Sequence, residues 1–427
     1  MVLMQNHFVQ NELPQFIFIA IGVRMRYLLR MLPISLISLI GLTMPAGRLG
    51  AAEPYADALE EAQQADANLA LVAVPPQVER ALDQAIAFMQ APTGAVTLGT
   101  WRPLLAFIRQ EAASGRAWQP KDRWDADGAA TLVSLPSPLS KHVALYYSLT
   151  IPDYAIFPSS MRFSSVLDTA AFTRATLACV PHAIPLNQYA YGRFRCIEET
   201  TPNPQSGTAY HYTNVRAIAR LNLAGREIFM SFSDMLGRSS YAVRGVPVGP
   251  LDDHVYYYSE KPGTNLRGLS WVQPAMYVSR SLIINVALDE RHTASCAFSW
   301  VNAGWRGINV TRTSHIIPIL QTIQQKMFDL ARAPNASVAQ FSTLTDNVMG
   351  LPTAQVNARY QTYCDYVTTY RDKGKKGLTS ILTRNILGEL YDAKTMARLD
   401  GSHRRALILQ EEVRRLLGQP TWSAGQP

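Results

Sequence analysis

The segment that most constrains the fold lies in the middle of the chain, between Arg226 and Thr313. Its runs place apolar and polar residues at alternate positions, as in Ser281–Leu288, where every second residue is Leu, Ile or Val. Successive side chains of a strand point to opposite faces, so a period of two indicates half-buried strands. Three further runs show the same alternation: Arg226–Phe232, His254–Ser259 and Cys296–Val301.

The gaps between these runs contain Gly and Pro, which favour turns, and they show no helical pattern. Strands joined in this way favour an antiparallel arrangement over βαβ units. Helical spacing occurs on either side, with Val78, Leu82 and Ile86 before the runs and the segment Ser402–Leu417 after them. The sequence therefore predicts an α+β fold, with a central antiparallel β-sheet or sandwich domain flanked by N-terminal and C-terminal helical segments.

The same patterns divide the chain into segments. We expect a signal peptide region at 1–52, an N-terminal helical segment at 53–117, a linker at 118–140, a β-rich domain at 141–317 and a C-terminal helical segment at 318–427. Within the β-rich part, alternating residues predict a strand at Lys141–Thr150. The proline-rich stretch Ile151–Asn214 is expected to be a long loop region, which is unusual unless it is functional or pinned covalently.

The N-terminus carries the pattern of an export signal. Three arginines, the last of them Arg30, precede the uncharged apolar run Met31–Met44, and the small residues Gly50, Ala51 and Ala52 follow it. A basic region, an apolar region of this length and a small-residue cleavage site are typical of a secretory signal peptide. We therefore expect a periplasmic or secreted protein, with Met25 as an alternative start. Retention of the segment as a membrane anchor is the alternative to cleavage.

The net charge is mildly basic. The chain carries a formal charge of +8, and residues 1–52 contribute four arginines against one glutamate, so the remainder carries +5. Such a charge permits attraction to anionic partners but is not the concentrated basic patch of a nucleic-acid-binding protein. We expect no nucleic-acid partner, and membrane association only through an uncleaved N-terminal segment.

Four cysteines, Cys179, Cys196, Cys296 and Cys364, follow the signal region. An even number in an exported chain indicates disulfides, and a bond between Cys179 and Cys196 would pin the proline-rich stretch. Such a bond typically contributes about 3 kcal/mol. The cysteines do not have the C-x-x-C spacing of zinc or redox sites.

Two acidic and histidine groups could carry chemistry. Asp253 and His254 stand at the start of one predicted strand, and Asp289 and His292 follow the end of another. Carboxylates and imidazoles brought together at one end of a sheet can bind a divalent metal or act as acid and base. Asp and His are also common turn residues, and none of the usual hydrolase, metalloprotease or nucleotide-binding motifs occurs in the sequence.

Aromatic and basic residues suggest a binding surface. The loop Asn302–Gly307 could present Trp305 for stacking and Arg306 for an anion, while Tyr256 and Tyr258 could line a groove. The alternative is structural: a tight turn with glycines at positive φ, and aromatic side chains that fill the core of the sheet.

Three functional hypotheses follow. The first is an exported, non-enzymatic cell-envelope protein that binds a ligand or another envelope component through its β-rich domain. The second is a hydrolase or metal-dependent enzyme that uses Asp253, His254, Asp289 and His292. The third is a membrane-anchored assembly subunit. The sequence specifies no cofactor, metal or ligand.

Overall fold

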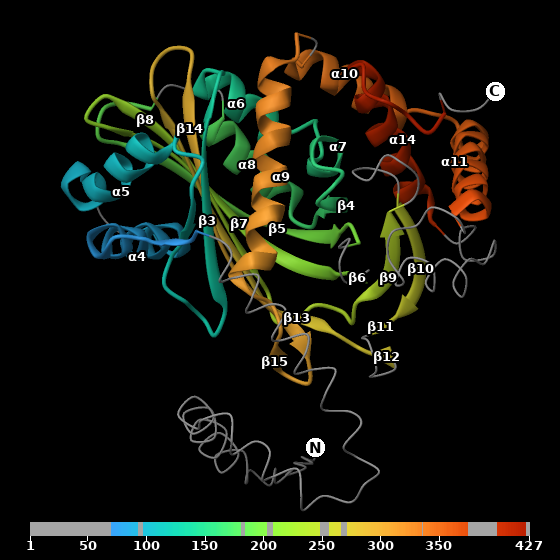
Figure 1. Ribbon diagram of the computed structural model, residues 1–427. Helices are drawn as coiled ribbons and strands as arrows, with labels where there is room; N and C mark the ends of the chain where they lie inside the picture. Colours follow the sequence, from blue (N-terminus) through green and yellow to red (C-terminus); the bar gives the residue numbers. More distant parts are fainter. Residues whose placement is uncertain are drawn as a thin grey trace, which may run out of the picture. The chain divides into compact units, whose positions relative to one another are not determined.

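The computed structural model describes residues 70–92, 97–180, 184–202, 208–247, 256–265, 271–334, 336–374 and 399–423. Within these ranges the fold centres on a ten-stranded sheet with the order β1-β2-β3-β14-β13-β8-β7-β5-β4, in which β15 also pairs with β14 (Figure 1). The pairing of β1 with β2 is parallel, and the other pairings of this sheet are antiparallel. The predicted α+β fold with a central antiparallel sheet is confirmed.

The strands of the large sheet are β1 (Val72–Ala73), β2 (Ala117–Gln119), β3 (Asp127–Leu135), β4 (Met161–Val166), β5 (Tyr189–Thr200), β7 (His211–Leu223), β8 (Arg226–Met235), β13 (Ala275–Ala287), β14 (Thr293–Trp305) and β15 (Ile308–Asn309). Two smaller sheets consist of β6 (Thr208–Ala209), β9 (Val243–Pro247) and β10 (Tyr256–Pro262), and of β11 (Thr264–Asn265) and β12 (Trp271–Val272).

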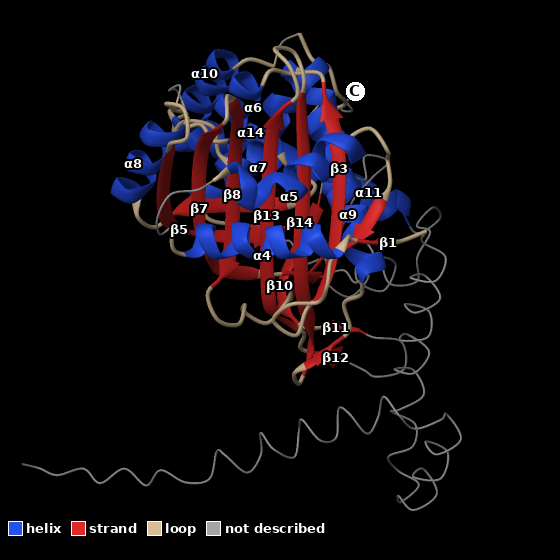
Figure 2. Ribbon diagram, turned by 90° about the vertical axis from the view of Figure 1, so that its left-hand side faces the viewer, coloured by secondary structure: helices blue, strands red, loops and turns tan. Residues whose placement is uncertain are grey.

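The helices are α4 (Pro76–Gln90), α5 (Leu98–Glu111), α6 (Leu139–Tyr146), α7 (Asp153–Ile156), α8 (Thr169–Cys179), α9 (Thr313–Arg332), α10 (Val338–Met349), α11 (Thr353–Gly374) and α14 (Gly401–Leu416). Helices α4 and α5 cover one face of the large sheet, and Figure 2 shows them in front of the strands. Helices α6, α8 and α9 pack on the opposite face.

The period of two along the strands decides which core each side chain enters. On β7, Ala217 and Ala219 join the core under α4 and α5, whereas Ile218 between them joins the core under α6 and α8. On the paired central strands, Leu282 lies opposite Phe298 in the core under α4 and α5. Helices therefore cover both faces of these strands. The alternating pattern alone predicted that only one face is buried.

Two local predictions in this part of the chain were wrong. The expected linker at 118–140 contains strand β3. Most residues of β3 are buried, so its sequence does not alternate between apolar and polar residues and resembles a connection between elements. The expected strand at Lys141–Thr150 lies largely in α6, where Leu139, Val143 and Tyr146 recur at helical spacing and are all buried. A run of so few residues fits both the helical period and the strand period of two. Packing of its buried side chains on the sheet stabilises the helix here.

The proline-rich stretch at 151–214 is also not a long loop. It contains α7, β4, α8, β5, β6 and the start of β7. Two of its prolines lie at element boundaries: Pro152 precedes α7, and Pro158 lies in the turn before β4. Proline at an element boundary is well tolerated because it removes no internal hydrogen bond there.

The C-terminal helices begin earlier than the sequence suggested. Helix α9 starts at Thr313, so Pro318 lies inside it, and α14 is capped by the side chain of Asp400, which accepts hydrogen bonds from the backbone of Ser402 and His403. Within the described residues, no helix combines the length and apolar character needed to cross a bilayer. The predicted signal region at 1–52 lies outside the described residues.

Candidate functional site

Of the two predicted catalytic groups, the first, Asp253 and His254, lies outside the described residues. Asp289 and His292 occupy the turn between β13 and β14 and are exposed. The Asp289 carboxylate accepts hydrogen bonds from the backbone N–H of Arg291 at 2.7 Å and of His292 at 2.8 Å, and it contacts the His292 ring at 3.0 Å. The first of these bonds makes the largest contribution to lowering the pKa of Asp289. In the described residues, both side chains therefore stabilise a turn.

The predicted binding residues Trp305 and Arg306 belong to a hairpin. Strand β14 continues to Trp305, so the expected loop at Asn302–Gly307 shrinks to a two-residue turn at Arg306 and Gly307, with φ values of 53° and 78°. Two positive φ values are typical of the turn that joins twisted strands. A side chain at Gly304 would lie 1.8 Å from the carbonyl oxygen of Ile308, so the close strand pairing accounts for this glycine.

Tyr256 and Tyr258 lie on β10, which pairs with β9 and not with the large sheet. Tyr256 is paired with Pro247 and Tyr258 with Gly245. The two tyrosines therefore stand on a different sheet from β14, which ends at Trp305.

The expected disulfide is not formed. All four cysteines are free, and the thiol of Cys179 donates to the carbonyl oxygen of Ile218, whereas that of Cys196 contacts the Glu198 carboxylate at 3.4 Å. Cys179 ends α8 and Cys196 lies within β5, so the packing of α8 on the sheet, and not a covalent bond, holds this region. Burial raises the pKa of Cys179 to about 12, which makes its thiol unreactive.

A cavity of about 300 Å³ lies on the face of the sheet that carries α8. The connection between α6 and α7 forms one wall, and residues of β4, α8, β5, β7 and α10 form the others. Most of its contributing side chains are apolar, among them Phe172, Phe194 and Ile218. The tertiary structure brings these segments together from positions between Tyr146 and Met349, and no single stretch of sequence encodes the cavity.

A buried ion cluster borders this cavity, and two of its members, Asp153 and Arg216, belong to the lining. The guanidinium of Arg216 on β7 donates to the carboxylate of Asp153 on α7, and also to that of Glu198 on β5 at 2.7 Å. Burial alone would lower the pKa of Arg216, but the two carboxylates raise it above its usual value. One cation between two anions gives the cluster a net charge of −1.

Glu198 is further fixed by neutral donors. Its carboxylate accepts hydrogen bonds from the hydroxyl of Tyr212 at 3.0 Å and from the side-chain amide of Asn214 at 3.1 Å. The side chain of Glu198 is only 5% exposed, so these bonds offset its loss of hydration. The carboxylate is thus held in one position by Arg216, Tyr212 and Asn214.

Two polar atoms at the cavity lack a partner. The hydroxyl of Thr176, in a residue that is 3% exposed, and the Nε of Arg216 have no hydrogen-bond partner among the described residues. Both residues line the cavity. Both atoms are buried from solvent beside the cavity, and a buried polar group without a partner is costly.

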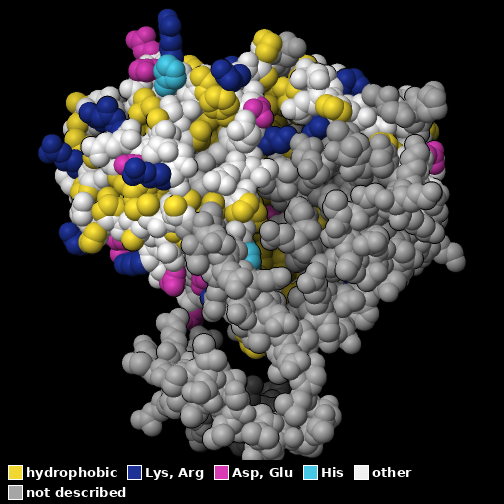
Figure 3. Space-filling model, viewed as in Figure 1, with side chains coloured by type: hydrophobic (Ala, Val, Ile, Leu, Met, Phe, Trp, Pro, Cys, Tyr) yellow, Lys and Arg dark blue, Asp and Glu magenta, His cyan; other side chains and the backbone are white. Residues whose placement is uncertain are grey.

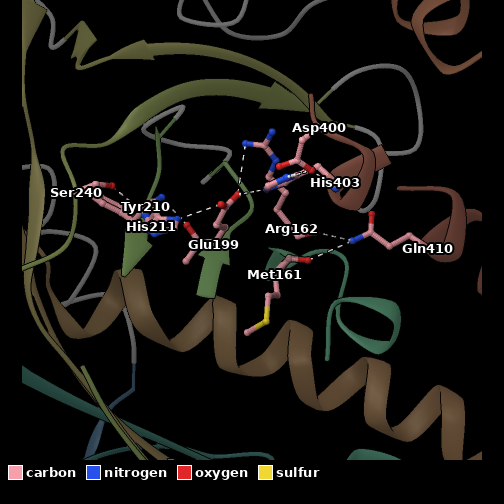
Figure 4. A network of polar contacts seen from close by, with 10 residues as sticks. Met161, Arg162, Glu199, Tyr210, His211, Ser240, Asp400, His403 and Gln410 are labelled. Carbon is pink, nitrogen blue, oxygen red and sulfur yellow. Dashed lines mark hydrogen bonds and ion pairs between the residues drawn. The ribbon is translucent and has the colours of Figure 1, made fainter. Parts of the chain in front are cut away.

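A second polar network joins β5 to the last helix (Figure 4). Glu199 on β5 contacts His211 through one oxygen and His403 of α14 through the other, each at 3.0 Å. The ring of His403 also contacts Asp400 at 2.9 Å, and Arg162 of β4 approaches Glu199 at 3.8 Å. The network holds the start of α14 against the edge of the large sheet.

We predict that this network gives a pH-dependent contribution to stability. Burial would raise the pKa of Glu199, but the bond to His403 and the charge of Arg162 lower it to about 2, whereas the pKa of His403 is raised by Glu199 against the effect of its burial. The Glu199 contribution is present above its ordinary pKa of 4.5 and is lost as the pH falls toward 2. The His403 contribution is present below its ordinary pKa of 6.5 and is lost as the pH rises through its raised value.

The measurement is urea unfolding between pH 4 and pH 9 for the wild type and His403→Gln. The wild type should exceed the variant by about 1–2 kcal/mol near pH 5.5, and the difference should shrink at alkaline pH. His315→Gln is the control, because His315 lies at the start of α9 and not in this network. A difference independent of pH would contradict the prediction.

Within the described residues, no group of three or more His, Cys, Asp and Glu side chains is arranged to hold a metal ion. The charges on the described part of the face shown in Figure 3 are mixed, with basic side chains scattered among acidic and apolar ones.

The comparisons with known proteins give no family. No family model matches the chain, and no curated protein does. Among solved structures, the chain is similar to human STARD10, with 12% identity over 54% of this chain and 78% of that one and a TM-score of 0.26. It is also similar to the lipid transfer and protein localization domain of human StarD13 (DLC2), with 9% identity over 57% of this chain and 100% of that one and a TM-score of 0.24. Scores this low support no argument about fold or function.

Sequence reasoning missed Asp153, Glu198 and Arg216. One signal was present in the segment His211–Leu223, where Asn214, Arg216, Arg220 and Asn222 fall at even positions next to the apolar residues of Val215–Leu223. Charged residues at alternate positions of a strand that is covered on both faces must find partners in the interior.

Proposed function

We propose that the protein binds a small, largely apolar molecule in the cavity between α8, α10 and the strands β4, β5 and β7. The observation that carries this proposal is the cavity itself, about 300 Å³ in volume and lined mainly by apolar side chains. Ligand sites typically combine an apolar lining with a few fixed polar groups. Here the polar side chains of the lining include Asp153, Thr176 and Arg216.

The charge of the ion cluster limits the chemistry of this ligand. Arg216 is already paired with Asp153 and Glu198, so an anion would meet a cluster of net charge −1. A neutral molecule with a hydrogen-bonding group, or a weakly cationic one, meets no such repulsion. The Thr176 hydroxyl can donate to or accept from that group.

Blocking the cavity mouth should abolish binding. Ser165 lines the cavity and is exposed, so Ser165→Trp places an indole at the entrance without filling a packed core. With the neutral fluorescent dye prodan as probe, we expect the wild type to shift its emission to the blue and the variant to bind at least about tenfold more weakly. The control is Ala113→Trp, an exposed position after α5. Equal binding by all three proteins would refute the proposed site.

A second variant separates binding from stability. Thr176→Val keeps the shape of the side chain and removes the unpartnered hydroxyl. Removing a buried polar group without a partner should leave the free energy of unfolding unchanged or raise it by about 1 kcal/mol. Binding of prodan, whose carbonyl can accept a hydrogen bond, should weaken in the same variant.

We also propose that the protein is exported. Support comes from the sequence, where a basic region, an apolar run and small residues precede Glu53. The buried cysteines are compatible with an oxidising compartment, because burial raises their pKa and suppresses the reactive thiolate. Expression of the full chain in a secreting bacterial host, followed by mass spectrometry of the N-terminus, should give a mature chain that begins at Glu53. An intact N-terminus in the membrane fraction would favour the anchored alternative.

A further inference from the structure

A second cavity, of about 280 Å³, lies between α7, α9 and α14. Figure 1 shows α7 between the other two helices. The cavity has an apolar base formed by Ile156, Leu330 and Val413, which are 3–4% exposed. It belongs to a different set of residues from the first cavity, because the two linings share no residue.

The ionisable side chains of this cavity are mainly basic. Among the described residues, Lys326, Arg332 and Arg414 line it, with Asp329 as the only acidic side chain. The lining thus carries a net charge of +2, in contrast to the net charge of −1 at the ion cluster of the first cavity. The Asp329 carboxylate accepts a hydrogen bond from the amide of Gln325 at 2.8 Å, and the Arg414 guanidinium donates to the carbonyl oxygen of Pro420 at 2.9 Å.

Two of the basic side chains, Arg332 and Lys326, lie where they can contact the charged end of a bound molecule. They do not form the apolar base of the cavity. Arg332 is exposed, lies in the last turn of α9 and rests over the ring of Phe328 at 4.9 Å, and Lys326 lies half-buried on the same helix. A molecule with its apolar part against Leu330 and Val413 would therefore present its polar end to these cations. Anions are favoured where cations gather beside a surface of low polarity.

We propose that this second cavity binds an amphipathic monoanion, specifically a medium-chain carboxylate. The apolar base accepts the chain, and Lys326 and Arg332 pair with the carboxylate. A carboxylate suits the arginine because a planar guanidinium can donate two parallel hydrogen bonds to it. The proposal does not depend on the ligand of the first cavity.

The test compares three probes with the same chain and different ends. Isothermal titration calorimetry of the full chain with octanoate, octanol and octylammonium should rank octanoate first and octylammonium last. In the double variant Lys326→Gln, Arg332→Gln, octanoate should bind about fivefold more weakly, while octanol should be unaffected. Raising the salt concentration should weaken octanoate binding to the wild type and not to the double variant.

The matched control removes the same charges elsewhere. Arg109 lies in the last turn of α5, as Arg332 does in α9, and Lys141 is exposed on α6, so Arg109→Gln, Lys141→Gln should leave octanoate binding unchanged. Ala333→Trp, which fills the cavity from its partly exposed side, should abolish binding of octanoate.

Three results would overturn the inference. The first is octanoate binding that the Lys326→Gln, Arg332→Gln variant does not weaken. The second is octylammonium binding as tight as that of octanoate. The third is loss of octanoate binding in Ser165→Trp but not in Ala333→Trp, which would place the chain in the first cavity.

Discussion

Replacing Arg216 by methionine is expected to destabilise the protein by about 3–5 kcal/mol. The substitution keeps an apolar side chain of similar length but removes the cation that pairs with Asp153 and Glu198. Two carboxylates then lie close together in a site where their side chains are 22% and 5% exposed. Breaking a buried ion pair on one side is costly because the remaining charge keeps its desolvation penalty.

Urea unfolding at pH 7 measures this loss. Arg195→Met is the matched control, since Arg195 lies on the adjacent strand β5 and is exposed, and its effect should be within about 0.5 kcal/mol. Adding Asp153→Asn and Glu198→Gln to Arg216→Met should recover most of the stability, because the triple variant has no unpaired charge. If Arg216→Met costs no more than Arg195→Met, the ion cluster has no energetic role and the prediction is wrong.

Replacing Trp300 by alanine is expected to cost about 3–5 kcal/mol. Trp300 is fully buried on β14, and its ring packs edge-on against Trp124 with centroids 5.4 Å apart. Its indole N–H donates to the carbonyl oxygen of Lys121 at 3.1 Å, and the guanidinium of Arg123 lies 4.9 Å above the ring. The side chain therefore links the central sheet to the segment before β3.

This segment is in turn tied to α4, because Arg123 pairs with Glu79 at 2.7 Å and with Asp83 at 2.6 Å. Loss of the ring should thus loosen α4 as well as leave a cavity. Trp300→Phe is the comparison: it keeps most of the apolar surface and loses the hydrogen bond, so it should cost less than half as much. Hydrogen exchange of the α4 amides should accelerate in Trp300→Ala, and unchanged exchange would contradict the proposed link.

The sequence predicted the elements whose side chains have one clear period. The strands at Ser281–Leu288 and Cys296–Val301 and the helices α4 and α14 were found because alternation or helical spacing extends over enough residues to exclude the other period. These patterns are local, since they reflect which side of one element faces the core. The fold class followed from their order.

The errors occurred where burial is not one-sided or where the run is short. Strand β3 is covered on both faces, with Ala130 under α4 and α5 and Ala129 against α9, so its sequence has no alternation to detect. Helix α6 is short, and its alternating appearance could not be distinguished from a strand. The disulfide prediction failed for a related reason: sequence spacing does not report that Cys179 and Cys196 are held by packing and have separate partners.

The sequence by itself determined the class of fold, the strands with clear alternation and the long amphipathic helices, because each depends on the interaction of neighbouring residues with one surface. Only the tertiary structure decided the two cavities and the ion cluster. Asp153 and Arg216 are 63 residues apart, and Glu198 and Arg216 are 18 apart. The antiparallel register of β5 with β7 and the docking of α7 bring them together. Such contacts arise from the free energy of the whole packed chain, which no local pattern records.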